Sequence, residues 1–271
     1  MSLLILSGAA LLLVLWLLGQ PRLAEWRRER LRRKPFPRPW WQILLRRVPV
    51  YRHLPADLQL RLKRQIQVFL AEKPFVGCAG LTVTDEMRVT VAALACLLIL
   101  HRGGEAFPNL RQILLYPGAF FVDRPHVGAA GVQQENRRLL SGESWARGQV
   151  ILSWQDTLAG AADPGDGHNV VLHEFAHQLD QETGPANGAP WLPRSARPRW
   201  AQVLGAEFDA LRQRVELGLP SLLADYGASD PAEFFAVATE VFFEQPQPLA
   251  LEHPALYAEL SAFYQVDPLS W

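Results

Sequence analysis

Apolar residues recur at helical spacing in two stretches of the first hundred residues. In ADLQLRLKRQIQVFLAE, four of them fall on one face of a helix, namely Leu58, Leu62, Ile66 and Phe69. The second stretch, TDEMRVTVAALACLLILHRG, begins with Thr84 as an N-cap, has acidic residues in its first turn and continues as an apolar run. That run is too short to cross a membrane and is bracketed by charges, so it predicts a buried helix.

Strand patterns cluster in the middle of the chain. The segments are QILLYP (around 113–117), AFFVD (119–123) and GQVILSW (148–154), each short, apolar or alternating, and bounded by Gly, Pro or Asp. A polar loop, AGAADPGDGHN, follows the last strand, and helical patterns continue to the end of the chain. A small sheet followed by several helices predicts an α+β fold in which helix predominates.

The first twenty residues contain no charged side chain. As a helix they would span roughly 30 Å, the thickness of the hydrocarbon core of a bilayer. A cleaved secretory signal would need basic residues before the apolar run, and none is present. Basic residues follow the run and favour a cytoplasmic location for that flank. We therefore expect residues 1–20 to be a single transmembrane anchor in the inner membrane, with the rest of the chain in the cytoplasm.

The formal net charge is zero, but the charge is unevenly distributed. Up to residue 64 there are 14 Lys and Arg against 3 Asp and Glu, and the remainder has 13 against 24, so the two parts carry +11 and −11. Residues 21–55 combine Arg with Trp26, Trp40 and Trp41, a composition that suits an anionic lipid surface. A solvated linker or a nucleic-acid contact would give a similar pattern. The position directly after the anchor favours lipid, and we expect no direct nucleic-acid binding.

Two cysteines, Cys78 and Cys96, are too few for a disulfide framework and lack the close spacing of a cysteine metal site. Both are interpreted as core thiols, in keeping with a reducing compartment. The globular domain is expected to cover residues 56–271.

The candidate chemistry lies in VVLHEFAHQLD, residues 170–180. On a helix, His173 and His177 lie one turn apart on the same face, where two imidazoles can bind one Zn²⁺. Glu174 is rotated by about 100° and can hold a water molecule without binding the metal itself. A polar helix face without metal is the alternative, but buried histidines without partners would cost several kcal/mol. The motif therefore predicts one zinc ion per chain.

A catalytic zinc site normally has three protein ligands and one open position. The third histidine of HExxHxxGxxH is absent, which excludes the metzincin pattern. The candidates for a third ligand are Asp180, Glu207, Glu233, Glu240 and His253. Asp180 lies one turn past His177 on the same helix face, so it is better placed to orient a ligand or to line the cleft.

Glu233 lies in DYGASDPAEFFAVATEVFF, where Asp230 is a plausible N-cap and Pro231 fits the first helical position. Glu233 could simply be the capping-box partner of Asp230. Glu240, seven residues later, lies on nearly the same helix face and is the main rival. Spacing favours Glu233 as the ligand and leaves Glu240 open.

These segments resemble the Mlc titration factor A family of zinc peptidases, which is distantly similar to the catalytic domain of anthrax lethal factor. The likeness rests on HEFAHQLD, QETGPANGAP and DYGASDPAEFFAVATEVFF, and on the earlier EKPFVGCAGLTVTDEMRVTVAALACLLIL and GQVILSWQDTLAG. It covers roughly residues 55–250 and implies a zincin-like metallopeptidase fold. It also implies that His173, His177 and Glu233 are zinc ligands and that Glu174 is the catalytic carboxylate.

The resemblance further implies a mechanistic role for Tyr226, a modest aminopeptidase-type activity and, in some members, binding to the glucose repressor Mlc. It does not extend to residues 1–50, so the anchor rests on the hydrophobic pattern alone. We expect Glu174 to act as the base in water-mediated peptide hydrolysis and Tyr226 to donate to the developing oxyanion. The strand in GQVILSW is expected to form the sheet edge along which a peptide substrate pairs.

The alternative is a non-catalytic, membrane-tethered protein that sequesters a transcriptional repressor, with zinc as a structural element. A structural site would be closed by a fourth Cys or His ligand. His168 lies in a Gly-rich loop and both cysteines lie far upstream, so the sequence favours an open, catalytic site.

Overall fold

The computed structural model describes residues 16, 19–102, 105–127, 133–140, 142–145 and 148–271. Most of the expected transmembrane anchor, residues 1–15 and 17–18, lies outside this part of the chain. In the part that is described, no helix has the length and apolar character needed to cross a bilayer. The prediction of an anchor therefore stays a prediction.

The centre of the molecule is a sheet with the strand order β1-β2-β6-β5. Its strands are β1 (Phe75–Gly77), β2 (Gln112–Tyr116), β6 (Gln149–Ser153) and β5 (Gly142–Trp145). The first three run parallel, with Ile113 of β2 opposite Val150 of β6, whereas β5 runs antiparallel to β6. The expected strands in QILLYP and GQVILSW are confirmed. The expected sheet edge was wrong, because β6 pairs on both sides and β5 forms the edge beside it.

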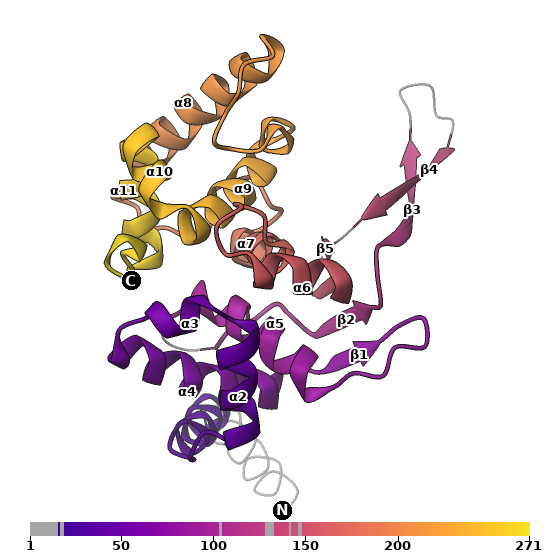
Figure 1. Cartoon of the computed structure of the whole chain (residues 1–271), viewed down its shortest axis with the longest axis vertical. Helices are drawn as coiled ribbons and strands as arrows, with labels where there is room; N and C mark the ends of the chain where they lie inside the picture. Colours follow the sequence, from indigo (N-terminus) through magenta and orange to yellow (C-terminus); the bar gives the residue numbers. More distant parts are fainter. Residues whose placement is uncertain (1–15, 17–18, 103–104, 128–132, 141, 146–147) are drawn as a thin grey trace, which may run out of the picture.

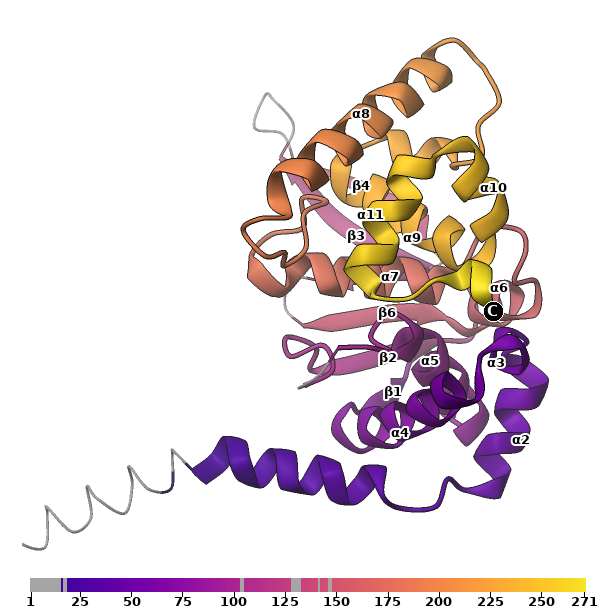
Figure 2. The same cartoon turned by 90° about the vertical axis from the view of Figure 1, so that its left-hand side faces the viewer.

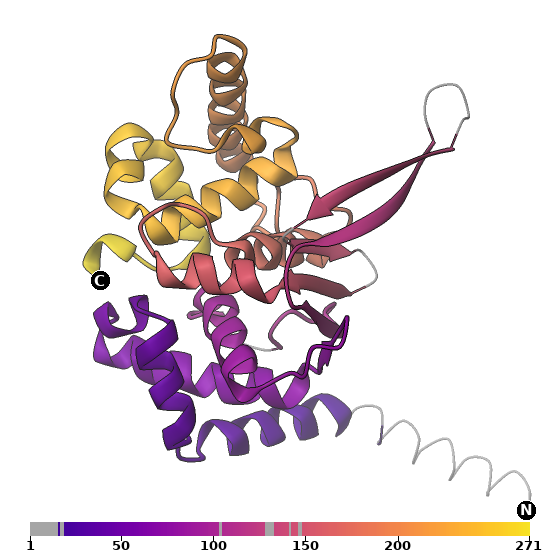
Figure 3. The ribbon, with the colours of Figure 1, turned by 45° about the vertical axis from the view of Figure 1, so that its right-hand side comes forward.

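Two further strands, β3 (Phe120–Val127) and β4 (Gln133–Leu140), pair antiparallel as a separate hairpin. The expected strand in AFFVD is the start of β3. The hairpin projects away from the body of the molecule (Figure 3). Because β3 and β4 pair only with each other in the described part of the chain, they add no strand to the central sheet.

The N-terminal half contributes four helices: α2 (Arg38–Arg47), α3 (Val50–His53), α4 (Ala56–Glu72) and α5 (Asp85–Leu97). Helix α5 packs against α2 and α4 on one side and against α6 and α7 of the C-terminal half. The four apolar positions expected on α4 are buried, and Thr84 caps α5 by accepting a hydrogen bond from the Met87 N–H. Leu44, Val48 and Tyr51 are buried in the same core. The core thus includes part of the segment expected to lie at the membrane.

A helix over residues 19–32 lies below α4 at the edge of the molecule (Figure 2). Arg28 connects it to the domain, since its guanidinium lies 2.7 Å from the Glu72 carboxylate and 3.1 Å from that of Glu105. Trp16, Leu23 and Trp26 remain exposed.

The C-terminal half is helical (Figure 1). It contains α6 (Trp154–Ala162), α7 (Val170–Asp180), η1 (Gln181–Thr183), α8 (Arg197–Glu216), η2 (Asp225–Ala228), α9 (Pro231–Glu244), α10 (Pro246–Glu252), α11 (Pro254–Tyr264) and η3 (Pro268–Ser270). The predominantly helical α+β fold is thereby confirmed. Helix α7 joins the two halves: Phe175 packs against Phe107 and Phe69, with ring centroids 4.8 and 5.8 Å away, while α9 packs against another side of α7.

Of the two cysteines, Cys96 is fully buried in α5 as expected, and burial raises the pKa of its thiol. Cys78 is only partly buried, because it follows the short strand β1 in a turn at the surface. Both are free thiols.

Candidate metal centre

Helix α7 starts after Asn169, whose side chain accepts hydrogen bonds from first-turn N–H groups that have no carbonyl acceptor within the helix. The Asn169 side-chain oxygen accepts hydrogen bonds from the N–H groups of Val171 and Leu172, both at 3.2 Å. Apolar side chains occupy one side of the helix, and the two histidines occupy another. Val171, Leu172, Phe175 and Leu179 are buried in the core, and this packing fixes the rotation of the helix. The histidines are thereby turned toward α9.

Three side chains converge between α7 and α9. Glu233 Oε2 lies 2.9 Å from His173 Nε2 and 3.3 Å from His177 Nε2. The three donor atoms all lie within 4.8 Å of one another. Glu233 reaches this position from the first turn of α9, whose N-cap Asp230 accepts hydrogen bonds from the N–H groups of Ala232 and Glu233. Asp230 and Pro231 thus occupy the N-cap and first helical positions expected from the sequence.

Glu240 contacts His173 from the opposite side of the imidazole ring. His173 Nδ1–H donates to Glu240 Oε1 at 2.7 Å, and the Asn169 N–H donates to Glu240 Oε2 at 2.5 Å. The carboxylate therefore fixes both the rotation and the tautomer of the ring. Glu240 orients His173 and does not join the cluster of three donor atoms.

This arrangement places two hydrogen-bond acceptors, His173 Nε2 and Glu233 Oε2, next to each other. A neutral imidazole has one N–H, so when Nδ1–H donates to Glu240, Nε2 of His173 directs a lone pair at the Glu233 oxygen. Such a contact requires a proton or a cation between the two atoms. Burial disfavours the charged imidazolium, but hydrogen bonds to Glu233 and Glu240 outweigh it and raise the pKa of His173 well above its usual range.

The Glu233 carboxylate is held in its ionised form. Burial opposes ionisation, yet hydrogen bonds from His173 and His177 prevail and hold the pKa of Glu233 well below its usual range. The carboxylate thus carries a negative charge throughout the neutral pH range. A site with two imidazole nitrogens and one ionised carboxylate is suited to a divalent metal of the zinc type, whereas Mg²⁺ and Ca²⁺ prefer oxygen ligands.

Glu174 and Tyr226 lie at the rim of this cluster. Glu174 is 5% exposed, and its charge contributes to the raised pKa values of His173 and Tyr226. Tyr226 belongs to η2, is 55% exposed, and its ring centroid lies 6.0 Å from that of His173. Partial desolvation beside the cluster and the charge of Glu233 raise the pKa of Tyr226, which keeps the hydroxyl protonated as a hydrogen-bond donor.

The paired HExxH helix and glutamate helix agree with the comparison to known families. Residues 23–265 of the chain match the family described as glucose-regulated metallo-peptidase M90. The chain belongs to the M90 metallopeptidase family.

Relatives support this assignment over most of the chain. An uncharacterized protein of Synechocystis sp. is 40% identical over 259 residues, which cover 95% of this chain and 94% of the relative. Mlc titration factor A of Klebsiella pneumoniae is 36% identical over 235 residues, covering 86% and 87%. Mlc titration factor A of Escherichia coli is 34% identical over 234 residues, covering 85% and 87%. The resemblance to the Mlc titration factor A family is thus confirmed.

In this M90 chain, Asp180 holds a loop. Its buried carboxylate accepts hydrogen bonds from the N–H groups of Asn187 (2.8 Å), Gly188 (2.7 Å) and Ala189 (3.0 Å). Burial raises the pKa of Asp180, although these three donors favour its ionised form. The side chain therefore connects the end of α7 to the following loop.

The remaining candidates for a third ligand lie elsewhere. His253 Nδ1–H donates to Glu207 Oε2 at 2.7 Å, a pair that joins α8 to the start of α11. Neither residue joins the cluster of donor atoms found among the described residues. Of the five candidates named from the sequence, Glu233 alone faces both Nε2 atoms.

Two residues around the centre have no counterpart in the sequence-based prediction. Asn169 caps α7, contacts Glu240 and donates through Nδ2 to Glu244 Oε1 at 2.9 Å. Burial raises the pKa of Glu244 to about 8. An Asn directly before an apolar helical run is a known N-cap signal, so the cap could have been found. Its contacts with Glu240 and Glu244 join residues more than seventy positions apart and leave no local pattern.

Proposed function

We propose that the chain is a zinc-dependent peptidase in which His173, His177 and Glu233 bind the metal. The observation that carries the proposal is the convergence of the two Nε2 atoms on one oxygen of an ionised carboxylate. A cation placed between them would remove the repulsion of facing lone pairs. The donor set, two nitrogens and one oxygen, is that of a zinc hydrolase.

When bound, zinc would acidify a water molecule and polarise the carbonyl of the cleaved bond. Glu174 accepts the proton of the attacking water and passes it to the leaving nitrogen. Its burial places this transfer away from bulk solvent. Tyr226 donates its hydroxyl proton in a hydrogen bond to the oxyanion that develops on the substrate, a contact typically worth about 3 kcal/mol. Glu240 keeps the His173 ring in position throughout.

The site is better suited to catalysis than to a structural metal. A structural zinc site is closed by four protein ligands, usually including Cys. Among the described residues, only His173, His177 and Glu233 form a metal-binding group. Both cysteines lie in other parts of the fold, in α5 and after β1. With these three protein ligands, a bound zinc ion would keep a further position for water.

The proposed substrate is a peptide, with an aminopeptidase-type activity as the finer expectation. Strand β5 supplies a means of holding an extended chain, because it pairs with β6 on one side and has no strand on its other side in the described part of the sheet. A peptide added there would form main-chain hydrogen bonds, and its side chains would alternate between the two faces.

The test is a measurement of metal content together with cleavage of chromogenic aminoacyl and internally quenched peptides. Purified protein should contain about one zinc per chain. Removing the metal with a chelator should abolish cleavage, and adding zinc back should restore it. Unchanged cleavage by metal-free protein would refute the proposal.

A second function is favoured by the names of the relatives. The curated relatives in Klebsiella and Escherichia are called Mlc titration factor A. We propose that this chain also binds a transcriptional repressor of the Mlc type, either besides its peptidase activity or in its place. Affinity capture with Glu174→Gln protein should retain such a repressor from the same organism. A repressor that does not bind the purified full-length chain would refute this.

For the location, we propose a single-pass anchor at residues 1–20 with the catalytic domain in the cytoplasm. The helix over 19–32 supports a lipid contact, since Leu23 and Trp26 are exposed and the Arg30 guanidinium lies over the Trp26 ring. Indole and basic side chains together favour the interface of an anionic membrane. Full-length protein should resist extraction from the membrane by salt or carbonate, whereas protein lacking residues 1–20 should be released by salt. Full-length protein found free in the cytosol would overturn the anchor.

A further inference from the structure

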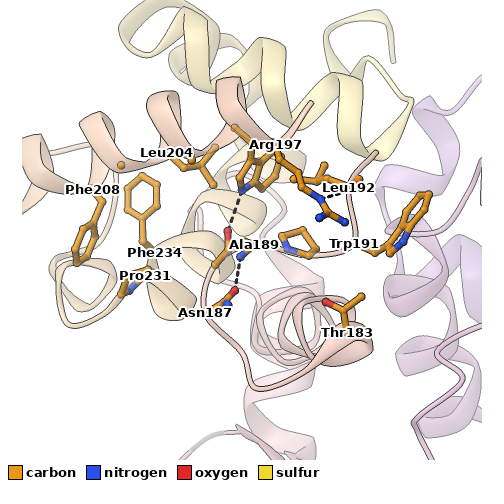
Figure 4. A pocket seen from close by; sticks show the side chains of 15 residues that line it. Thr183, Asn187, Ala189, Trp191, Leu192, Arg197, Leu204, Phe208, Pro231 and Phe234 are labelled. Atoms are coloured by element: carbon orange, nitrogen blue, oxygen red, sulfur yellow. Dashed lines mark hydrogen bonds between the residues drawn. The ribbon is translucent and has the colours of Figure 1, made fainter. Parts of the chain in front are cut away.

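A cavity of about 590 Å³ lies between α8, the loop that follows η1 and the first turn of α9 (Figure 4). Its volume is within the range of small-molecule and side-chain binding sites. Large apolar side chains surround it, namely Trp191, Leu192, Trp200, Leu204, Phe208 and Phe234. Among the described residues that line it, Arg197 is the one with a charged side chain.

Hydrogen bonds hold the loop at the floor of this cavity in place. Gly188 donates its N–H to Asp180 and accepts a hydrogen bond from Trp200 Nε1–H at 2.9 Å. Gly188 has a φ of 76°, and a Cβ at this position would lie 2.3 Å from the Pro231 carbonyl oxygen. The loop is therefore clamped between α7, α8 and α9. The cavity is formed before any ligand binds, which lowers the entropic cost of binding.

Two helices connect the cavity with the proposed metal centre: α9 lines the cavity and carries Glu233, and α7 carries both His177 and the residue that holds the floor loop. Pro231 and Phe234 line the cavity, and Glu233 lies between them on the first turn of α9. On α7, Asp180 holds the floor loop one turn past His177. A peptide whose cleaved bond lies at His177 and Glu233 would therefore carry a neighbouring side chain toward this cavity.

We propose that the cavity binds a bulky apolar side chain of the substrate, adjacent to the cleaved bond. The proposal rests on the peptidase function and names the substrate class of that site. The apolar walls favour Phe or Leu, and Arg197 disfavours Lys or Arg at the same position. Each added methylene changes kcat/KM by about 10–200-fold in such pockets, so Phe should be preferred over Gly by at least about a hundredfold.

Gly205 offers a way to fill the cavity without harming the fold. It lies within α8 and lines the cavity, and a Cβ added there meets no atom within 4 Å. Gly205→Leu also introduces a better helix former. The matched control is Ala206→Leu, which adds a leucine at the next position of the same helix. Both positions are exposed, but Ala206 does not line the cavity.

The experiment compares cleavage of two peptide series, with Phe or Gly placed on the amino side or on the carboxyl side of the cleaved bond. In wild type and Ala206→Leu, one series should show the preference for Phe. In Gly205→Leu the preference should fall at least about tenfold, while cleavage of the Gly peptide persists. A folded, metal-loaded Gly205→Leu protein with an unchanged preference would overturn the proposal, as would a wild type that shows no preference in either series.

A binding measurement needs no turnover and separates this inference from the peptidase function. Trp191 and Trp200 line the cavity, so its occupation should change tryptophan fluorescence. N-acetylphenylalaninamide should cause a saturable change in Glu174→Gln protein, N-acetylglycinamide should not, and Gly205→Leu should abolish the change. Binding to Glu174→Gln protein, together with a metal-loaded wild type that cleaves no peptide, would refute the proposed function and leave the cavity's ligand class standing. Absence of binding to a folded protein would refute the cavity proposal itself.

Discussion

Replacing Glu240 by Gln tests how His173 is held for metal binding. The carboxylate accepts two hydrogen bonds, from His173 Nδ1–H and from the Asn169 N–H. Gln has nearly the same shape but presents one oxygen and one NH₂ group, so one of the two donors would face another donor. Losing a hydrogen bond to a charged group costs about 1.5–3 kcal/mol. At about 1.4 kcal/mol per tenfold, this corresponds to roughly a 10–100-fold loss of zinc affinity.

The assay is zinc titration of apo-protein against a competing chelator at pH 7. Glu244→Gln is the matched control. Glu244 has a pKa of about 8 and is therefore mainly protonated at pH 7, so Gln imitates its native state while the contact with Asn169 remains available. We expect the control to bind zinc as wild type does. The reasoning fails if Glu240→Gln binds zinc with wild-type affinity, or if its loss matches that of removing Glu233.

Three further outcomes are expected. Glu233→Ala should lower zinc affinity by about two to four orders of magnitude in the same titration, since about 10–16 kcal/mol of binding is shared among three or four ligands; a loss smaller than that of Glu240→Ala would reverse the assignment of the third ligand. Tyr226→Phe should retain zinc and the fold while turnover falls by about 10²–10³, and unaltered kcat would exclude the hydroxyl from the reaction. Burial raises the pKa of Glu244 above its unfolded value, so the native state binds more protons between about pH 5 and 8 and the free energy of unfolding falls as pH rises through that window; Glu244→Gln should flatten this slope in urea titrations, and an equal slope would show that Glu244 is ionised in the fold.

Local patterns explain which features the sequence predicts. The spacing of His173 and His177 is a property of one helix, and the apolar residues around them show which face is buried. Thr84 and Asp230 are N-caps because a side chain and backbone groups two or three residues away interact. Each of these signals lies within a few residues of the chain.

Contacts between distant segments explain what the sequence does not predict. Glu233 and Glu240 lie on nearly the same helix face, so spacing favours Glu233 without excluding Glu240. The packing of α9 against α7 distinguishes the residue at Nε2 from the residue at Nδ1. The position of β6 inside the sheet depends on β5, whose strand pattern in the sequence is weak. Asp180 binds a loop through backbone N–H groups, a role that its position on the histidine face does not reveal.

The central claim is that Glu174 is the base of a metal-dependent peptidase. Glu174→Gln removes the proton acceptor and leaves the three proposed ligands in place. Zinc content and peptide turnover should be measured on the same preparation of this variant and of wild type. We predict one zinc per chain in both and a loss of turnover of at least about a hundredfold in the variant. A variant that binds zinc and cleaves peptides at the wild-type rate would contradict the mechanism.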